Sequence, residues 1–397
     1  MRWRAYLGDT MTGLVGAPID LPNFSWSVSV SDSSLSTTKD KNVGADTVSS
    51  LTVPWAAVPG DTPTLRSAAL APARRSIVLC RDLGDGTLGV PILWGAIGPR
   101  RDSWLDTSFD LDSALTLLDS RYMVREDVYG AGDASTSPDQ IYLSGLSLRG
   151  IASEVGHQCT NAKPAGALPI DWTYRGEPGD HERTYEAFNI ANLSGKAIFE
   201  KLANVLGGPD MQFRPYLADP QHVRLAFLAG SDADVVLGQS VVHSLRLFPG
   251  GGDLQDATLD HAGPIMRVYG SGSGTDAAQI THLSADLALA QLGDPWPLVE
   301  ATFADSDADD ADLLARDTEA RLAANCRPLM QLSGTLDCSD EHTPQPGEFW
   351  PGEVFEVSID GFPTLPGGVY PMRLMEMSGD QTSRVKLVFD VMDNPIY

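Results

Sequence analysis

The chain has 397 residues, of which 42% are hydrophobic, so it has enough apolar material for a packed core and is not a disordered chain. Its 53 acidic and 28 basic side chains leave a formal net charge of −25, which argues against stable binding to nucleic-acid phosphates. No stretch of about 18 apolar residues occurs, so we expect no membrane span. The N-terminal segment also lacks the continuous apolar run of a secretory signal.

Residues 1–120 are predicted to form a β domain, either a barrel or a sandwich. In Ser25–Val30, apolar and serine side chains alternate with a period of two, which is typical of a half-buried strand. Ser31–Asp46 is rich in Ser, Thr, Asp and Lys and predicts a loop. Two apolar runs flank an Asp-Gly pair and predict a β-hairpin, with strands at Ser76–Arg81 and Val90–Ile97.

Residues 121–235 predict a small α+β domain. Leu146–Cys159 and Leu193–Leu206 have the apolar spacing of helices, and Ser194 is placed to cap the second one. Two apolar segments separated by an Asp-Pro turn should form a hairpin on that helix, at Met211–Pro215 and Val223–Leu228.

Residues 236–397 predict a second β-barrel-like domain, with a helical insertion at about 276–325. Its alternating segments include Ser240–Phe248 and Val385–Val391, and the latter is our expectation for pairing between domains. In the insertion, a run of aspartates precedes a helix, where acidic side chains complement the helix dipole. The predicted fold is therefore mainly β (α+β): two β-barrel-like domains, an intervening α+β domain and a helical insertion.

The search for chemistry predicts no catalytic, cofactor-binding or metal-binding residues and no cofactor. No histidine pair has the i, i+4 spacing of a helical zinc site, and no serine-hydrolase elbow occurs. Acidic pairs suited to glycoside hydrolysis are left open, since 53 acids always contain some pair at the right separation. The cysteines form no C-x-x-C pair and are expected to be reduced and mostly buried: Cys80, Cys159, Cys326 and Cys338.

Two loops resemble ligand-binding motifs in part. Gly270–Thr275 is glycine-rich but lacks the P-loop lysine, so we interpret it as a flexible turn. Asp305–Asp310 begins like a calcium loop, but the sixth position is Asp310 rather than glycine and the twelfth is Arg316 rather than glutamate. A helix N-terminus is the preferred interpretation there, and weak divalent-ion binding is the alternative. The eight tryptophans are scattered, which favours core or interface anchors over a sugar-stacking platform.

The order of segments resembles the tail-tip (baseplate) hub proteins of long-tailed siphophages, the minor tail proteins of actinobacteriophages. Four stretches carry the resemblance: the hairpin ending in Trp94–Ile97, the helix Ala197–Leu206 with the strands after it, Val268–Gly272 leading to Pro295–Glu300, and the C-terminal strands from Pro346 to Met392. Together they span most of the chain.

The resemblance implies a structural virion protein of the phage tail tip and no enzyme. It implies a homotrimeric baseplate hub, in which each copy supplies two barrel domains, so that six barrels adapt a hexameric tail tube to a threefold tip. The implied partners are a distal tail protein or tail-tube ring, the C-terminus of the tape-measure protein and other tail-tip proteins. Such a hub closes or lines the DNA channel used in DNA ejection, and an acidic channel would repel DNA.

Some members of this family carry a C-terminal lytic or receptor-binding extension. This chain ends directly after its last strand pattern, so we do not expect wall hydrolysis here. Assembly in the host cytoplasm, with a final location at the virion tail tip, agrees with the missing signal segment. The alternative function is a receptor- or carbohydrate-binding tail-tip protein, and a peptidoglycan hydrolase is a third hypothesis.

Overall fold

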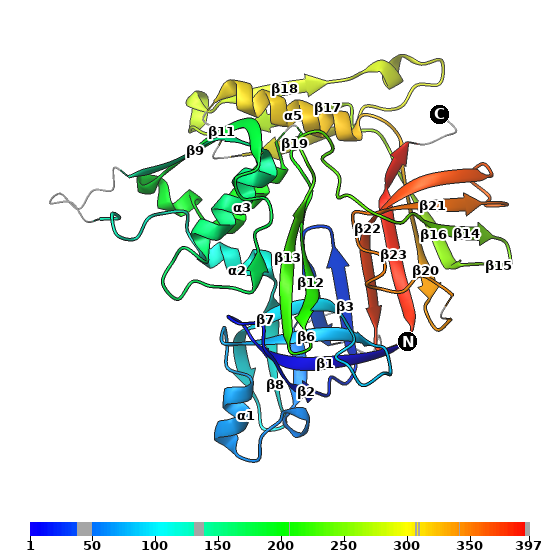
Figure 1. Ribbon diagram of the computed structural model, residues 1–397. Helices are drawn as coiled ribbons and strands as arrows, with labels where there is room; N and C mark the ends of the chain where they lie inside the picture. Colours follow the sequence, from blue (N-terminus) through cyan, green and yellow to red (C-terminus); the bar gives the residue numbers. More distant parts are fainter. Residues whose placement is uncertain are drawn as a thin grey trace.

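The computed structural model describes residues 1–37, 50–130, 139–205, 207–305, 308, 310–340 and 342–393. Over these residues the chain is mainly β, as predicted, with several short helices and two large antiparallel-rich sheets (Figure 1). Neither of the two large sheets is formed by one contiguous stretch of sequence, and the strand pairing decides how the regions lie against each other.

The N-terminal sheet has six strands in the order β2-β1-β6-β7-β8-β5, all antiparallel. The predicted hairpin is confirmed as β6 and β7, and Gly84, Gly86 and Gly89 in its loop all have positive φ angles that favour glycine. The strands are β1 (Arg2–Asp9), β2 (Val15–Ile19), β5 (Leu51–Pro54), β6 (Arg75–Asp82), β7 (Val90–Asp102) and β8 (Asp106–Asp112), with the short helices η1 (Trp55–Ala57), α1 (Pro63–Ala69), α2 (Ala114–Leu117) and η2 (Leu118–Ser120) beside them.

Strands β6 and β7 are buried on both faces. This explains why their sequences are continuous apolar runs and do not alternate between apolar and polar residues. On β6, Ile77 and Leu79 point into a core shared with the C-terminal sheet, whereas Val78 and Cys80 point into the core of the middle unit. The N-terminal sheet therefore packs against both of the other parts of the molecule. Two-sided burial favours apolar side chains at every position.

The middle unit packs two helices against a β-hairpin, as predicted. Helix α4 begins at its N-cap Ser194, whose side chain accepts from the backbone N–H of Ala197 at 3.2 Å. The hairpin strands β12 and β13 pair antiparallel. The elements are α3 (Leu148–Cys159), α4 (Gly195–Ala203), η3 (Ala187–Asn192), β9 (Gln140–Leu146), β10 (Ile170–Asp171), β11 (Pro178–Glu186), β12 (Met211–Asp219) and β13 (His222–Ala229).

Aromatic rings hold this middle unit together. Trp172, Phe199, Phe213 and Phe227 form mutual ring contacts, with centroids between 5.3 and 6.0 Å apart. Phe227 is fully buried, and such rings contribute about 0.5–1.5 kcal/mol per pair beyond their buried area. The predicted packing of the hairpin on helix α4 is thus held by contacts among these rings.

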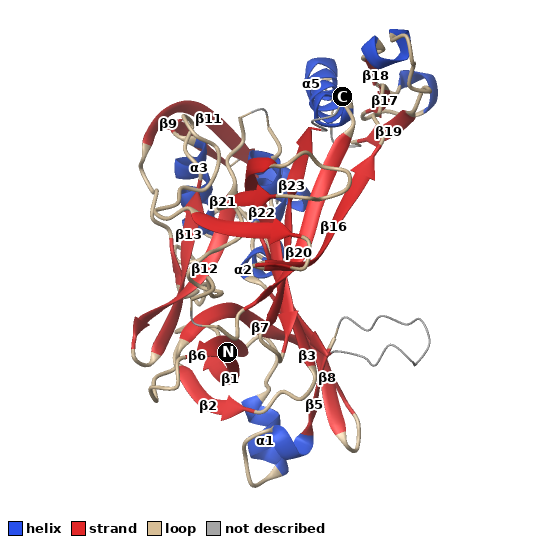
Figure 2. Cartoon of the chain, turned by 90° about the vertical axis from the view of Figure 1, so that its right-hand side faces the viewer, coloured by secondary structure: helices blue, strands red, loops and turns tan. Residues whose placement is uncertain are grey.

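The C-terminal sheet has nine strands, and two of them come from the N-terminal region. Its path is β15-β14-β21-β22-β23-β20-β16, and β3 pairs with β22 while β4 pairs with β3. Register shifts between β16 and β20, β20 and β23, and β22 and β23 add local twist and curl the sheet (Figure 2). The strands are β3 (Phe24–Ser29), β4 (Ser33–Thr37), β14 (His243–Phe248), β15 (Gly251–Gly252), β16 (Leu254–Ala262), β20 (Leu329–Asp337), β21 (Val354–Ile359), β22 (Gly368–Asp380) and β23 (Arg384–Asp393).

Several sequence predictions in this sheet need correction. Part of the loop predicted at Ser31–Asp46 is strand β4, because its serines pair along β3; residues 38–49 lie outside the described part. Strand β23 is central, with β22 and β20 on its two sides, so its edges are not free to pair between domains. Strand β16 was not predicted, because most of its side chains are exposed and show no apolar alternation.

The insertion is a mixed α/β unit rather than a purely helical one. Strand β17 lies between β18 and β19, and α5 packs on one face of this sheet through Leu314 and Leu322. Asp310 caps α5, since its side chain accepts from the N–H of Asp312 at 3.0 Å. The elements are β17 (Arg267–Ser271), η4 (Asp276–Ala278), β18 (Thr281–Ala285), η5 (Ala288–Gln291), β19 (Glu300–Ala304) and α5 (Ala311–Asn325).

One hydrophobic core joins the N-terminal and C-terminal sheets. It includes Leu7 and Ile97 of the first sheet and Phe355 and Phe389 of the second. The division into domains near residues 120 and 235 stays a prediction, but residues 24–37 belong to the sheet of the C-terminal region. No described helix is long and apolar enough to cross a membrane.

Candidate functional site at the junction of the sheets

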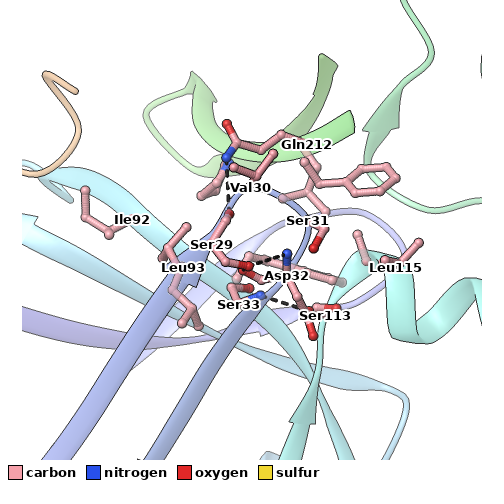
Figure 3. Close-up of a pocket in the computed structure, with 16 residues that line it drawn as sticks. Ser29, Val30, Ser31, Asp32, Ser33, Ile92, Leu93, Ser113, Leu115 and Gln212 are labelled. Carbon is pink, nitrogen blue, oxygen red and sulfur yellow. Dashed lines mark hydrogen bonds between the residues drawn. The ribbon is translucent and has the colours of Figure 1, made fainter. Parts of the chain in front are cut away.

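The most notable polar site of the molecule lies where its three parts meet. Figure 3 shows Gln212 beside the turn between β3 and β4, with Ile92, Leu93 and Leu115 around it. Gln212 is 3% exposed, and its Nε2 donates to the backbone oxygen of Ser29 at 3.3 Å and to that of Pro351 at 3.2 Å. One side chain of the middle unit thereby binds both an N-terminal and a C-terminal segment.

The turn next to Gln212 is itself fixed by hydrogen bonds. The backbone N–H of Asp32 donates to the Ser29 hydroxyl at 3.0 Å, and the N–H of Ser33 donates to the Asp32 carboxylate at 2.8 Å (Figure 3). These short-range bonds hold the turn in one shape. The acceptor oxygen of Ser29 is therefore presented to Gln212 without further ordering of the chain.

A largely buried ion pair lies close to Gln212 and begins on the same strand, β12. Arg214 Nη1 lies 2.9 Å from Glu353 Oε1, and the two side chains are only 15% and 10% exposed. Arg214 also lies over the Trp350 ring, 5.5 Å from its centroid. Burial lowers the pKa of the Arg214 guanidinium, while the nearby Glu353 carboxylate opposes that shift.

Further contacts reinforce the junction around this pair. Arg373 on β22 forms an ion pair with Asp210, directly before β12. Arg81 on β6 donates to the backbone oxygen of Pro346 at 3.0 Å. The Trp3 indole donates to the backbone oxygen of Thr382 at 3.1 Å and packs on Trp26 at 5.0 Å between ring centroids. The arrangement can hold the three parts of the chain at a fixed spacing.

Sequence reasoning missed these residues. Gln212 and Arg214 are polar side chains in a strand whose neighbours are apolar, and that position was the only signal that could have singled them out. Their partners lie 139 or more residues away along the chain. Nothing local to any of the segments indicates such a pairing.

The described parts of the two motif-like loops have structural roles. Gly270 lies in β17, and a Cβ atom there would come within 2.2 Å of Thr318 Oγ1, so glycine is required for α5 to pack closely. In the Asp305–Asp310 segment, Ser306, Asp307 and Asp309 lie outside the described residues; Asp310 acts as a helix cap. Across the described ranges, no group of three or more His, Cys, Asp or Glu side chains is placed to hold a metal ion.

The cysteines and tryptophans lie largely where the sequence predicted. All four cysteines are free thiols, and all but Cys326 are buried. Four tryptophans are buried, namely Trp26, Trp94, Trp172 and Trp350. Trp3, Trp55 and Trp296 are half-buried, and Trp104 is 97% exposed. The described tryptophans therefore form no exposed sugar-stacking platform.

Comparison with known proteins gives matches among solved structures. No protein-family model matches the chain, and no curated protein matches it. The chain is similar to the tail protein from Neisseria meningitidis (12% identity, TM-score 0.46, covering 98% of this chain and 96% of that chain). It is also similar to a 43 kDa prophage tail protein from Shewanella oneidensis (11% identity, TM-score 0.48, 98% of each chain). A third is a prophage tail protein from Listeria monocytogenes (12% identity, TM-score 0.40, 97% of this chain and 94% of that chain).

Proposed function

We propose that this chain is a structural protein of a phage virion, a homotrimeric hub at the tail tip without a catalytic role. The observation that carries the proposal is the junction described above: two β sheets, largely from opposite ends of the chain, share one core and are locked to the middle unit by Gln212 and by the Arg214–Glu353 pair. Each copy thus supplies two β units at a fixed spacing.

A protein that joins a sixfold ring to a threefold tip needs a fixed spacing between the two β units of each copy. Three copies with two rigid β units each would present six units in a ring, which matches a hexameric tail tube on one side and leaves threefold symmetry on the other. A flexible linker between the units would lose this match, because each unit would then sample many orientations. The distal tail protein or tube ring, the tape-measure C-terminus and other tail-tip proteins are the proposed partners.

The charge of −25 suits a channel for DNA. An acidic lining repels phosphates, so DNA passes with few and brief contacts. The competing explanation is that the charge only keeps the protein soluble. A charge map of the assembled trimer decides between them, and a neutral or basic lumen with all the acids outside would exclude the channel role for the charge.

The receptor- or carbohydrate-binding alternative gains little support from the described aromatic side chains. Stacking of sugars needs a group of exposed rings, whereas four of the eight tryptophans are buried and Trp104 stands apart. Binding of the purified protein to host cells or to cell-wall glycans at micromolar concentration would favour this alternative. Release of dye from labelled cell walls would favour the hydrolase hypothesis.

The deciding experiment is the assembly state. We expect mass photometry to give a particle of about three times the 42.5 kDa chain mass, and electron micrographs to show a threefold ring with six peripheral densities and a central pore or plug. Labelled antibodies should place the protein at the tail tip of intact virions. A stable monomer at all concentrations would overturn the proposal.

A further inference from the structure

The hairpin between β7 and β8 ends in an unusually exposed apolar tip, which we call the Trp104 tip (residues Ser103–Leu105). Trp104 is 97% exposed and Leu105 is 80% exposed. Exposed single apolar residues are common, but two adjacent large ones on a protruding turn mark an interaction site. Tryptophan is also among the residue types enriched in the side chains that dominate interface energies.

The Trp104 tip is held in one conformation. The Ser103 hydroxyl donates to the Asp106 carboxylate at 2.6 Å, and the Ser103 N–H donates to the Asp106 backbone oxygen at 2.8 Å. From the neighbouring segment, the Trp55 indole donates to the Ser103 oxygen at 2.9 Å, and the Trp55 N–H donates to the Leu105 oxygen at 3.1 Å. A preordered tip loses little conformational entropy on binding.

An apolar groove lies at the other end of the same strand. It is formed between the β6–β7 loop and the β12–β13 hairpin, and its lining includes Leu83, Leu88, Val90, Pro215, Leu217 and Trp350. Leu83 is 50% exposed, so part of this lining is uncovered apolar surface. We call it the Leu217 groove.

The Trp104 tip and the Leu217 groove are too far apart to meet within one chain. Val90 at the start of β7 lines the groove, and the tip follows the last residue of β7. A strand of 13 residues spans roughly 40 Å at 3.3 Å per residue, somewhat less where it bends. The two surfaces thus differ from each other and lie at opposite ends of strand β7. Head-to-tail contacts in a ring require two such different surfaces on each copy.

Charged side chains lie beside both surfaces. Arg101 next to the tip is exposed, whereas the two carboxylates beside the tip already have partners: Asp102 pairs with Arg100 at 2.9 Å, and Asp106 accepts from Ser103 at 2.6 Å. Asp85 and Asp219 in the groove lining are exposed carboxylates. In a chain with a net charge of −25, two copies repel each other overall, so a contact that brings Arg101 to these carboxylates is favoured over contacts between two acidic surfaces.

We propose that the Trp104 tip of one copy docks in the Leu217 groove of a second copy of this chain. The inference deepens the proposed function and rests on it, because this contact would be the one that closes the trimer. The indole would fill the apolar groove, and Arg101 would lie against the acidic groove residues.

Two variants of the whole chain test this contact. In Trp104→Ser/Leu105→Ser we expect the chain concentration for half-assembly to rise at least about 100-fold in mass photometry, because hot-spot side chains dominate affinity. Val241→Ser/Val242→Ser is the matched control, since it removes two apolar side chains that are 56% and 52% exposed elsewhere. It should assemble as the wild type does, and both variants should keep the wild-type circular dichroism and melting temperature.

A cross-link supplies the geometric test. Leu105→Cys/Leu217→Cys in a Cys326→Ser background should give chains joined by disulfides between copies after oxidation, and neither single cysteine should. A wild-type chain that never trimerises overturns the proposed function and this contact together. A trimer that persists in the tip variant overturns the contact alone, as does a tip variant that assembles normally but no longer binds another tail protein or a lipid vesicle.

Discussion

Arg214 in the middle unit and Glu353 in the C-terminal region form an ion pair of 2.9 Å across 139 residues of sequence. The pair is mostly shielded from water, and Glu353 also accepts from the backbone N–H of Trp350 at 3.2 Å. A carboxylate that binds both a guanidinium and a backbone amide fixes the β12 strand against the segment that leads into β21. The junction depends on this geometry more than on the net energy of the pair, because desolvation offsets much of the Coulomb attraction.

Glu353→Gln tests that role through stability. The change leaves Arg214 buried without its counter-charge, so we expect the free energy of unfolding in urea to fall by about 3 kcal/mol. The control is Asp253→Asn, which breaks an exposed pair with Arg246 (68% exposed) and should cost under about 1 kcal/mol. Equal losses in the two variants would contradict a structural role for the junction pair.

Phe227→Ala tests the aromatic core of the middle unit. Phe227 is fully buried among four other rings, so we expect a loss of about 4 kcal/mol from the cavity and the lost transfer energy. Phe188→Ala removes a ring that is 71% exposed and should change stability by no more than about 0.5 kcal/mol. Thermal melts of both variants provide the measurement.

Gly270→Ala tests the close packing of α5 on β17. The added Cβ would meet Thr318 Oγ1 at 2.2 Å, and such overpacking costs about 1–3 kcal/mol. Hydrogen exchange should speed up within residues 267–325 and stay unchanged in the N-terminal sheet. Thr318→Ala in the same chain should restore much of the protection, and Gly263→Ala, with open space around its Cβ, should have little effect. No rescue by the second change would show that the contact is not the cause.

Acid titration tests the Arg149–Glu177 pair beside α3. The Arg149 guanidinium holds the pKa of Glu177 below its ordinary value of 4.5, and Ser147 adds a hydrogen bond. The folded-state pKa is thus the lower one, so this contribution to stability is present above pH 4.5 and is lost as the pH falls through the folded pKa. In urea unfolding, Glu177→Gln should be clearly less stable than the wild type at pH 7, and the difference should shrink near pH 3. A difference that does not depend on pH would contradict this.

Thiol labelling tests the burial of the cysteines. Burial raises the pKa values of Cys80, Cys159 and Cys338 to about 12 each, so these thiols stay protonated and unreactive at pH 8. We expect a chromogenic disulfide reagent to label one thiol per native chain, Cys326, and all four after unfolding. Cys326→Ser should abolish native labelling, and rapid labelling of two or more native thiols would contradict the structure.

Local features of the molecule were predictable from particular residues. Ser194 marks the start of α4, and the Asp85-Gly86 pair marks the β6–β7 hairpin, because caps and tight turns depend on side chains within a few positions. The alternation in Ser25–Val30 correctly indicated strand β3, in which Trp26 and Val28 are buried. Strand β16 was missed, since a mostly exposed strand carries no such pattern.

The sequence by itself determined the mainly β class, the β6–β7 and β12–β13 hairpins and the helices α3 and α4, and it showed no evident catalytic motif. Only the tertiary structure decided that β3 pairs with β22 across about 350 residues, that β23 is central, and that Gln212 joins three distant segments. The physical reason is that the alternation of apolar and polar residues in a strand indicates which face is buried, but it does not indicate which strand lies beside it. Partners are chosen by the packing of the whole core, where the combined burial of many distant side chains outweighs any local preference.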